Sequence, residues 1–183
     1  MDARTRLIET ADRLFYDEGI RATGVDRLVE EADVAKMTLY NNFGSKDDLV
    51  VAYLRWRHDD WLRRLDIHLE KADTPVAAML AVFDAYLESA VQPGYRGCAF
   101  INAAAEIPRA DHPARAVIQE NKEGIHSLLH EKAAEAGAQD PRALADQLYL
   151  LLEGGIVTTG VRCDPEPLRW ARAGAETLIA ASV

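Results

Sequence analysis

Hydrophobic residues recur along the chain with the spacing of an α-helix. The first stripe consists of Leu7, Ile8, Ala11, Leu14 and Phe15, which fall on one helical face. Gly19 ends this pattern, because glycine readily adopts the left-handed conformation found at helix ends. No stretch shows the alternation of a β-strand, and no internal repeat is present, so the sequence predicts an all-α protein of about nine helices.

Two short helices are predicted over residues 25–32 and 36–43, and only Asp33-Val34-Ala35 separates them. We expect Thr23 and Asp26 to form a capping box at the start of the first one. Asp33 suits the tight turn, since aspartate tolerates the left-handed conformation. Ser45 and Asp48 predict a second capping box, which opens a long helix that reaches about residue 71.

Prolines mark the starts of later helices. Thr74-Pro75, Asp140-Pro141 and Asp164-Pro165 each place a capping side chain before a proline at the first helical position. Asp111-His112-Pro113 shows nearly the same pattern. We therefore expect helices to begin near residues 75, 98, 113, 141 and 165.

The pair of short helices has the dimensions of a DNA-binding helix-turn-helix. Leu39 and Phe43 would anchor the second helix. The side chains left to face a major groove are Lys36, Met37, Thr38, Tyr40, Asn41 and Asn42. Asparagine can pair with adenine, methyl groups contact thymine, and lysine and tyrosine reach phosphates. The alternative interpretation is a solvated corner between two helices, which is common in α-helical proteins.

Residues 7–54 resemble the DNA-binding segment of the TetR family of repressors. The resemblance rests on Leu14-Phe15, Gly19, Thr23, Val25, Val34, Leu39-Tyr40, Phe43, Ser45-Lys46 and Leu49. It implies that residues 36–42 form the recognition helix and that Tyr40 and Lys46 contact phosphates. Thr23 and Arg27 complete the expected DNA-binding set. Asp33, Ala35 and Met37 depart from the Gly, Ser and Gly usual in the family, so no base sequence is inferred.

The resemblance also implies two domains, a DNA-binding domain over 1–45 and a ligand-binding and dimerisation domain over 46–183. In the family the last two long helices pair with those of a second subunit. The residues expected at this interface are Leu148, Leu152, Gly155, Ile156, Leu168, Ala171, Ala175 and Leu178. The alternative is that these faces pack only within one chain.

A small-molecule pocket is a further expectation of the larger domain. Asn102 and Glu106 share one face of an otherwise apolar segment, where polar groups could orient a ligand. The candidate lining residues are Trp56, Trp61, Phe83, Tyr86, Phe100, Asn102, Glu106 and Tyr149. The alternatives are that the aromatic residues are core, and that Asn102 and Glu106 bond a neighbouring helix or the DNA-binding domain.

Charge and composition narrow the function further. The formal net charge of −9 over 183 residues argues against nucleic-acid binding, but affinity depends on the few cations that face phosphates. Dinucleotide, P-loop, esterase and metalloprotease motifs are absent, so we expect no enzyme and no cofactor. No secretory signal or membrane span is evident, which favours the cytoplasm.

Two pairs of residues invite other chemistry. Cys98 and Cys163 are too few for a disulfide scaffold or a zinc site. We interpret both as ordinary thiols, although Cys98 at a helix start could act as a redox sensor. His126 and His130 share a helical face but have no third ligand nearby in sequence, so no metal site is expected.

Together these patterns predict a homodimeric repressor that binds a palindromic operator and is released by an unidentified small molecule. The alternative is a helical interaction or sensor module whose DNA-reading head has degenerated.

Overall fold

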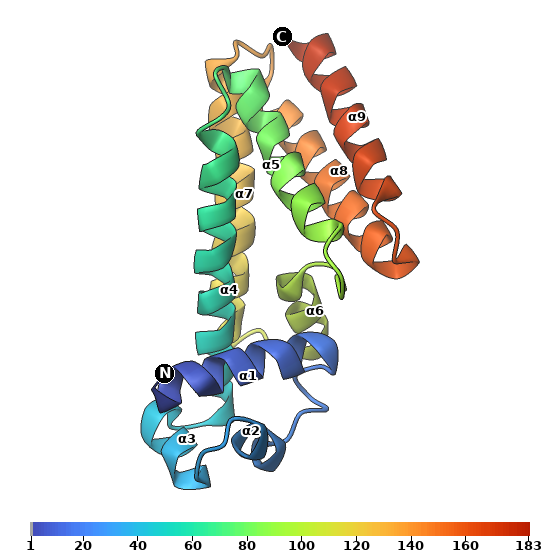
Figure 1. Cartoon of the computed structure of the whole chain (residues 1–183). Helices are drawn as coiled ribbons and strands as arrows, with labels where there is room; N and C mark the ends of the chain where they lie inside the picture. The colour runs from blue at the N-terminus through green and yellow to red at the C-terminus, as the bar shows by residue number, and fades with distance from the viewer. Residues whose placement is uncertain (1) are drawn as a thin grey trace. The chain divides into compact units, whose positions relative to one another are not determined.

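A computed structural model describes residues 2–183, and in this part of the chain the fold consists of nine helices and no strand (Figure 1). They are α1 Ala3–Asp17, α2 Val25–Glu31, α3 Lys36–Phe43, α4 Lys46–Leu69, α5 Pro75–Ala90, α6 Ala99–Glu106, α7 Ala114–Glu135, α8 Pro141–Arg162 and α9 Glu166–Ser182. The all-α prediction is confirmed, and the five later helices begin within one residue of the expected positions.

Side-chain caps explain several of these starts. Thr74 and Asp140 accept the backbone N–H groups of Ala77 and Ala143 at 3.1 and 3.0 Å. Ser45 accepts the N–H of Asp48 at 3.0 Å, as the predicted capping box requires. The box predicted at Thr23 is wrong, because Gly24 occupies the N-cap position of α2 and makes no side-chain cap.

The helices group into two compact units. The first contains the residues up to Asp60 together with Ala99–Glu120, and the second contains Trp61–Cys98 and Asn121–Val183. These units follow from contacts within the folded chain. The functional division between residues 45 and 46 remains a prediction.

In the first unit, α1 packs on α2 and α3. The apolar stripe of α1 supplies Leu7 and Leu14, which are completely buried. Phe15 meets Tyr53 of α4 edge to face, with ring centroids 5.5 Å apart. Burial of these side chains supplies most of the driving force that holds the short helices in place.

In the second unit, α8 and α9 form an antiparallel hairpin and α5 packs against α9 (Figure 1). A Cβ atom added at Gly155 of α8 would lie 2.8 Å from the Cβ of Ala171 and 3.0 Å from Leu168 Cδ1. The two helices therefore approach too closely for any larger residue at position 155 without repacking.

Candidate nucleic-acid interface

The turn between α2 and α3 is tight. Asp33 adopts the left-handed conformation with a φ of +51°, which aspartate accepts at lower cost than most residues. The next residue, Val34, donates its backbone N–H to the carbonyl of Val29 at 3.0 Å. Leu28, Ala32 and Leu39 are buried, so the two helices are held by apolar contacts and present their other faces outward.

The outward face of α3 carries the residues predicted to read DNA. Lys36, Met37, Tyr40, Asn41 and Asn42 are exposed, and Thr38 is half-buried. Met37 is 67% exposed, so its apolar side chain is accessible to a partner molecule. Asn42 donates its amide to the carbonyl of Thr38 at 2.7 Å. Five of the six residues predicted to face a major groove are therefore exposed, and their contact with DNA remains a prediction.

Two of the predicted DNA-binding cations are engaged by acids of the same chain. Lys36 Nζ donates to Asp26 Oδ1 at 2.7 Å, and this hydrogen bond raises the pKa of the ammonium. Arg27 pairs with Glu31 at 2.9 Å and Glu18 at 3.2 Å, and the bond to Glu31 raises the guanidinium pKa. All these groups are exposed, so the pairs can exchange for phosphate oxygens at small cost.

Thr23 and Lys46 point into the first unit. Thr23 is 1% exposed, and its hydroxyl donates to the carbonyl of Gly19 at 2.8 Å. The Lys46 ammonium donates to the carbonyl of Ile20 at 2.5 Å, and burial lowers its pKa. A direct DNA contact by Thr23 or Lys46 stays a prediction. The hydrogen bonds of both side chains to backbone carbonyls of the first unit do not favour it.

Glu106, predicted as a pocket residue, binds the loop between α1 and α2. Its two carboxylate oxygens accept the backbone N–H groups of Ile20 at 3.0 Å and Arg21 at 2.8 Å. A Cβ atom at Gly19 would lie 3.2 Å from this carboxylate. Of the alternatives left open by the sequence, contact with the DNA-binding segment is the one observed. Glu106, the last residue of α6, therefore fixes the backbone of the loop that precedes the helix-turn-helix.

Sequence reasoning did not single out Arg21. Its backbone is held by Glu106, while the residue itself is exposed. An arginine in the loop directly before a helix-turn-helix is a candidate for a phosphate contact.

The residues predicted for the dimer interface lie mostly inside the chain's own core. Seven of the eight, namely Leu148, Leu152, Gly155, Ile156, Leu168, Ala171 and Ala175, are buried, and Leu178 is half-buried. Side chains buried within one chain offer little surface to a second subunit, and the interface remains a prediction. The exposed apolar residues of α8 are instead Leu150, Val157 and Val161, at 69%, 46% and 80% exposure.

The other predicted pocket residues are divided between the two units. Trp56, Phe100 and Asn102 belong to the first unit, with Phe100 buried and Trp56 37% exposed. Trp61, Phe83, Tyr86 and Tyr149 belong to the second. There the rings of Trp61 and Tyr86 lie 4.1 Å apart, and Phe83 is fully buried as a core residue.

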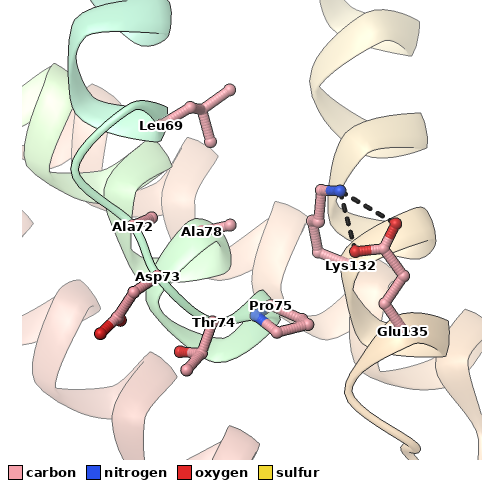
Figure 2. A pocket seen from close by; sticks show the side chains of 8 residues that line it. All are labelled: Leu69, Ala72, Asp73, Thr74, Pro75, Ala78, Lys132 and Glu135. Carbon is pink, nitrogen blue, oxygen red and sulfur yellow. Dashed lines mark hydrogen bonds and ion pairs between the residues drawn. The ribbon is translucent and has the colours of Figure 1, made fainter.

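A surface hollow of about 370 Å³ occurs elsewhere in the second unit, between the start of α5 and the end of α7 (Figure 2). Its lining residues are Leu69, Ala72, Asp73, Thr74, Pro75, Ala78, Lys132 and Glu135. None was predicted to bind a ligand. Lys132 pairs with Glu135 of the same helix at 2.9 Å, and Asp73 adds a further carboxylate to the lining.

The remaining candidates make local contacts. His126 pairs with Asp146 at 2.6 Å and meets the ring of Tyr149 edge to face. Cys98 is buried and Cys163 exposed, and both are free thiols. Within residues 2–183, no group of three metal-ligating side chains occurs. No helix in this range has the length and apolar character needed to cross a bilayer.

Comparison with known proteins covers most of the chain. A family model described as "Bacterial regulatory proteins, tetR family" matches residues 7–53. A second, "Tetracyclin repressor-like, C-terminal domain", matches residues 75–175. Among solved structures, a TetR-family transcriptional regulator from Streptomyces coelicolor is 32% identical, with a TM-score of 0.93 over 98% of this chain and 95% of that one.

Two relatives from Escherichia coli (strain K12) are also similar over nearly their whole length. The HTH-type transcriptional regulator YjdC is 27% identical, covering 92% of this chain and 95% of that protein. The HTH-type transcriptional repressor NemR is 26% identical, covering 98% and 94%. The exposed face of α3, its turn and these matches lead to one conclusion: the chain belongs to the TetR family and is a DNA-binding transcriptional regulator.

Proposed function

We propose that the protein is a homodimeric repressor that binds a palindromic operator and releases it when a small molecule binds. The observation that carries the proposal is the exposed polar face of α3 within a matched TetR-family helix-turn-helix. The proposal includes no catalytic step and no cofactor. It places the protein in the cytoplasm, where bacterial DNA lies.

Base reading is assigned to the middle of α3. Asn41 can hydrogen-bond to both major-groove edge groups of adenine, and the exposed Met37 side chain can pack on a thymine methyl group. Lys36 and Tyr40 of the same helix, with Arg21 and Arg27 from the preceding loop and helix, are assigned to phosphates. This chemistry favours an operator half-site rich in A·T pairs.

The dimer is assigned to the exposed stripe of α8, not to its buried face. Leu150, Gly154, Val157 and Val161 recur at intervals of three and four residues, which places them on one helical face. Trp170 of α9 is 56% exposed and lies under the Arg162 guanidinium, 5.3 Å from its ring centroid. A second copy would cover this apolar face, as in a two-fold interface where the same patch occurs on both subunits.

Release is assigned to α6. Because Glu106 at the end of this helix holds the backbone of the loop before α2, a ligand that shifts α6 also shifts the helix-turn-helix. Such a ligand must bind the released conformation more tightly than the DNA-bound one. In a dimer, recognition helices about 34 Å apart match successive major grooves, so a small shift reduces affinity.

Selection of binding sites from a random duplex library tests the proposal directly. We expect an enriched inverted repeat whose affinity falls as salt rises. The variant Asn41→Ala should lose discrimination at one base pair per half-site, by about 1–3 kcal/mol, whereas Gln139→Ala, at an exposed position of the second unit, serves as a control.

The second candidate is a helical interaction or sensor module whose helix-turn-helix no longer binds DNA. One observation favours it: acids of the same chain already bind Lys36 and Arg27. The selection is run at low salt with the protein as purified and again with protein that has been unfolded and refolded to remove a bound ligand. If neither sample enriches a duplex, the second candidate replaces the first.

A further inference from the structure

The surface hollow of the second unit takes no part in the proposed DNA binding. It lies between the start of α5 and the end of α7 and has a volume of about 370 Å³ (Figure 2), which is within the range of small-molecule sites. Half of its lining is apolar, namely Leu69, Ala72, Pro75 and Ala78. An apolar surface bordered by a few polar groups is the usual composition of a ligand site.

Two carboxylates lie on opposite sides of the hollow. Asp73 belongs to the loop between α4 and α5, and Glu135 is the last residue of α7. Figure 2 shows small apolar side chains between them. Asp73 is exposed, and it forms no ion pair with any side chain of residues 2–183. A cation from solution can therefore pair with Asp73 without displacing another partner.

The second carboxylate, that of Glu135, is only partly compensated. The Lys132 ammonium lies 2.9 Å from Glu135 and 3.1 Å from Glu131, and its hydrogen bonds to Glu135 and Glu131 raise its pKa. One ammonium thus faces two carboxylates, so these three side chains together keep one negative charge. With Asp73, two negative charges border the hollow.

The helix ends around the hollow also favour a cation. α4 ends at Leu69 and α7 ends at Glu135, so the hollow lies at the carboxyl ends of two helices, which carry partial negative charge. The start of α5 offers little to an anion, because Pro75 has no backbone N–H and Thr74 accepts the N–H of Ala77 at 3.1 Å. Carboxylates and helix ends therefore act together to attract positive charge.

We propose that the hollow binds linear aliphatic diamines in their doubly protonated form. One ammonium group pairs with Asp73 and the other with Glu135, while the methylene chain lies on the apolar residues between them. This ligand matches the lining, which is charged at both edges and apolar in the middle (Figure 2). A bare metal ion fits less well, since residues 2–183 contain no group of three metal-ligating side chains. The inference is independent of the proposed function, because it requires neither an operator nor a dimer.

Titration of the whole isotope-labelled protein with hexamethylenediamine, followed by the backbone amide signals in NMR spectra, tests the site. We expect the largest shifts at Asp73, Thr74 and Glu135. Hexylamine has the same chain but only one ammonium group, so it leaves one carboxylate without a partner. Because one exposed ion pair changes affinity by up to about fivefold, the diamine should bind more tightly than hexylamine by up to this factor. Both affinities should fall as salt rises.

Substitution of either carboxylate should remove the preference for the diamine. Asp73→Asn and Glu135→Gln should each weaken diamine binding to about the level of hexylamine, whereas hexylamine can still pair with the carboxylate that remains. The matched control is Glu123→Gln, at an exposed position of the same helix α7, which should keep the full preference. Because all three side chains are exposed, thermal unfolding should show that the variants stay folded.

Three results would overturn the proposal. Equal affinity for the diamine and hexylamine, or shifts spread over both units, would reduce binding to general attraction by a chain with a net charge of −9. A preference that survives in both Asp73→Asn and Glu135→Gln would overturn the assigned pairs. Absence of any shift at the hollow at low salt would overturn the site itself. The titration contains no DNA, so a failure of the proposed repressor function would leave these results unchanged.

Discussion

In the proposed complex with DNA, a phosphate oxygen competes with Asp26 for the Lys36 ammonium. Their side chains are 52% and 85% exposed, and the ammonium lies 2.7 Å from the carboxylate. Exposed pairs of this kind contribute at most about 1 kcal/mol, because water and salt screen them. DNA carries a much denser array of negative charges, so the exchange is favourable, but the pair still subtracts from the affinity.

Asp26→Asn should therefore bind operator more tightly than wild type, by up to about fivefold, which corresponds to about 1 kcal/mol. Fluorescence anisotropy with a labelled operator at two salt concentrations measures the effect. Asp73→Asn removes the same charge from an exposed position in the second unit and should change affinity much less. Equal gains from both variants would show that the net charge matters and the Asp26–Lys36 pair does not.

Single residues also show where sequence reasoning stops. Asp33 was placed correctly in a left-handed turn, since few residue types accept that conformation. Thr23 was assigned a cap on α2 because its spacing from Asp26 fits a capping box, yet its hydroxyl donates back to Gly19. Both bonds are local and similar in energy. The choice between them depends on the burial of the loop, which no short motif encodes.

Among the elements, α6 is only eight residues long but carries the contact that links it to the DNA-binding helices. The carboxylate of Glu106 accepts two backbone N–H groups of one loop. Its neighbour Arg115 donates to the carbonyl of Ala104 at 3.0 Å, which satisfies one of the free carbonyls at the end of α6. The C-terminal end of α6 is therefore fixed by two contacts, one through Glu106 to the loop before α2 and one through Arg115 of α7.

Glu106→Gln should loosen the loop, because an amide offers one acceptor oxygen where the carboxylate offers two. We expect faster hydrogen exchange at the amides of Ile20 and Arg21, and a loss of stability of about 1.5–3 kcal/mol for a bond to a charged group. Urea unfolding measures the second quantity. Glu123→Gln, at an exposed position of α7, is the control; similar exchange rates in both variants would contradict the role given to Glu106.

Gly155 offers a second test at this scale. Gly155→Ala places a Cβ atom 2.8 Å from Ala171 Cβ, so the α8–α9 hairpin must shift and stability should fall by about 1–3 kcal/mol. Gly124→Ala in α7 meets nothing within 4 Å and should stabilise the protein by up to about 1 kcal/mol through helix propensity. Thermal unfolding of the two variants should therefore move in opposite directions. A rise in both would mean that the hairpin has room to spare.

The same hairpin buries most of the residues predicted for the dimer interface, and their place in a dimer remains a prediction. Helical spacing in α8 gives two apolar stripes, one through Leu148 and Leu152 and one through Leu150 and Val157. Both satisfy the period of an amphipathic helix, and a single sequence does not say which stripe meets α9. The helices could be predicted from local patterns, whereas the partner of each face is a property of the tertiary fold.

For the whole molecule, net charge was a poor guide to the partner. The chain carries 30 acidic and 21 basic residues, which disfavours DNA at long range, yet local matches and the exposed face of α3 establish a DNA-binding regulator. Operator affinity depends on cations at the contact surface, and each phosphate neutralised contributes to the salt dependence. Loss of one such contact in Lys36→Met should reduce the salt slope by about one per subunit.

The proposed dimer depends on the exposed apolar stripe of α8. Val157→Glu would place a charge in the middle of the exposed stripe of α8, and in a dimer two such charges would be buried together at considerable cost. We expect sedimentation velocity to show a dimer for wild type and a monomer for the variant. The matched control is Ile67→Glu, at a 50% exposed position of α4, which should stay dimeric.

Because a monomer contacts only one half-site, Val157→Glu should also lose most of its operator affinity while keeping its helical content. A dimeric Val157→Glu protein would move the interface away from this stripe, and a monomeric wild type would remove the two-fold operator from the proposal.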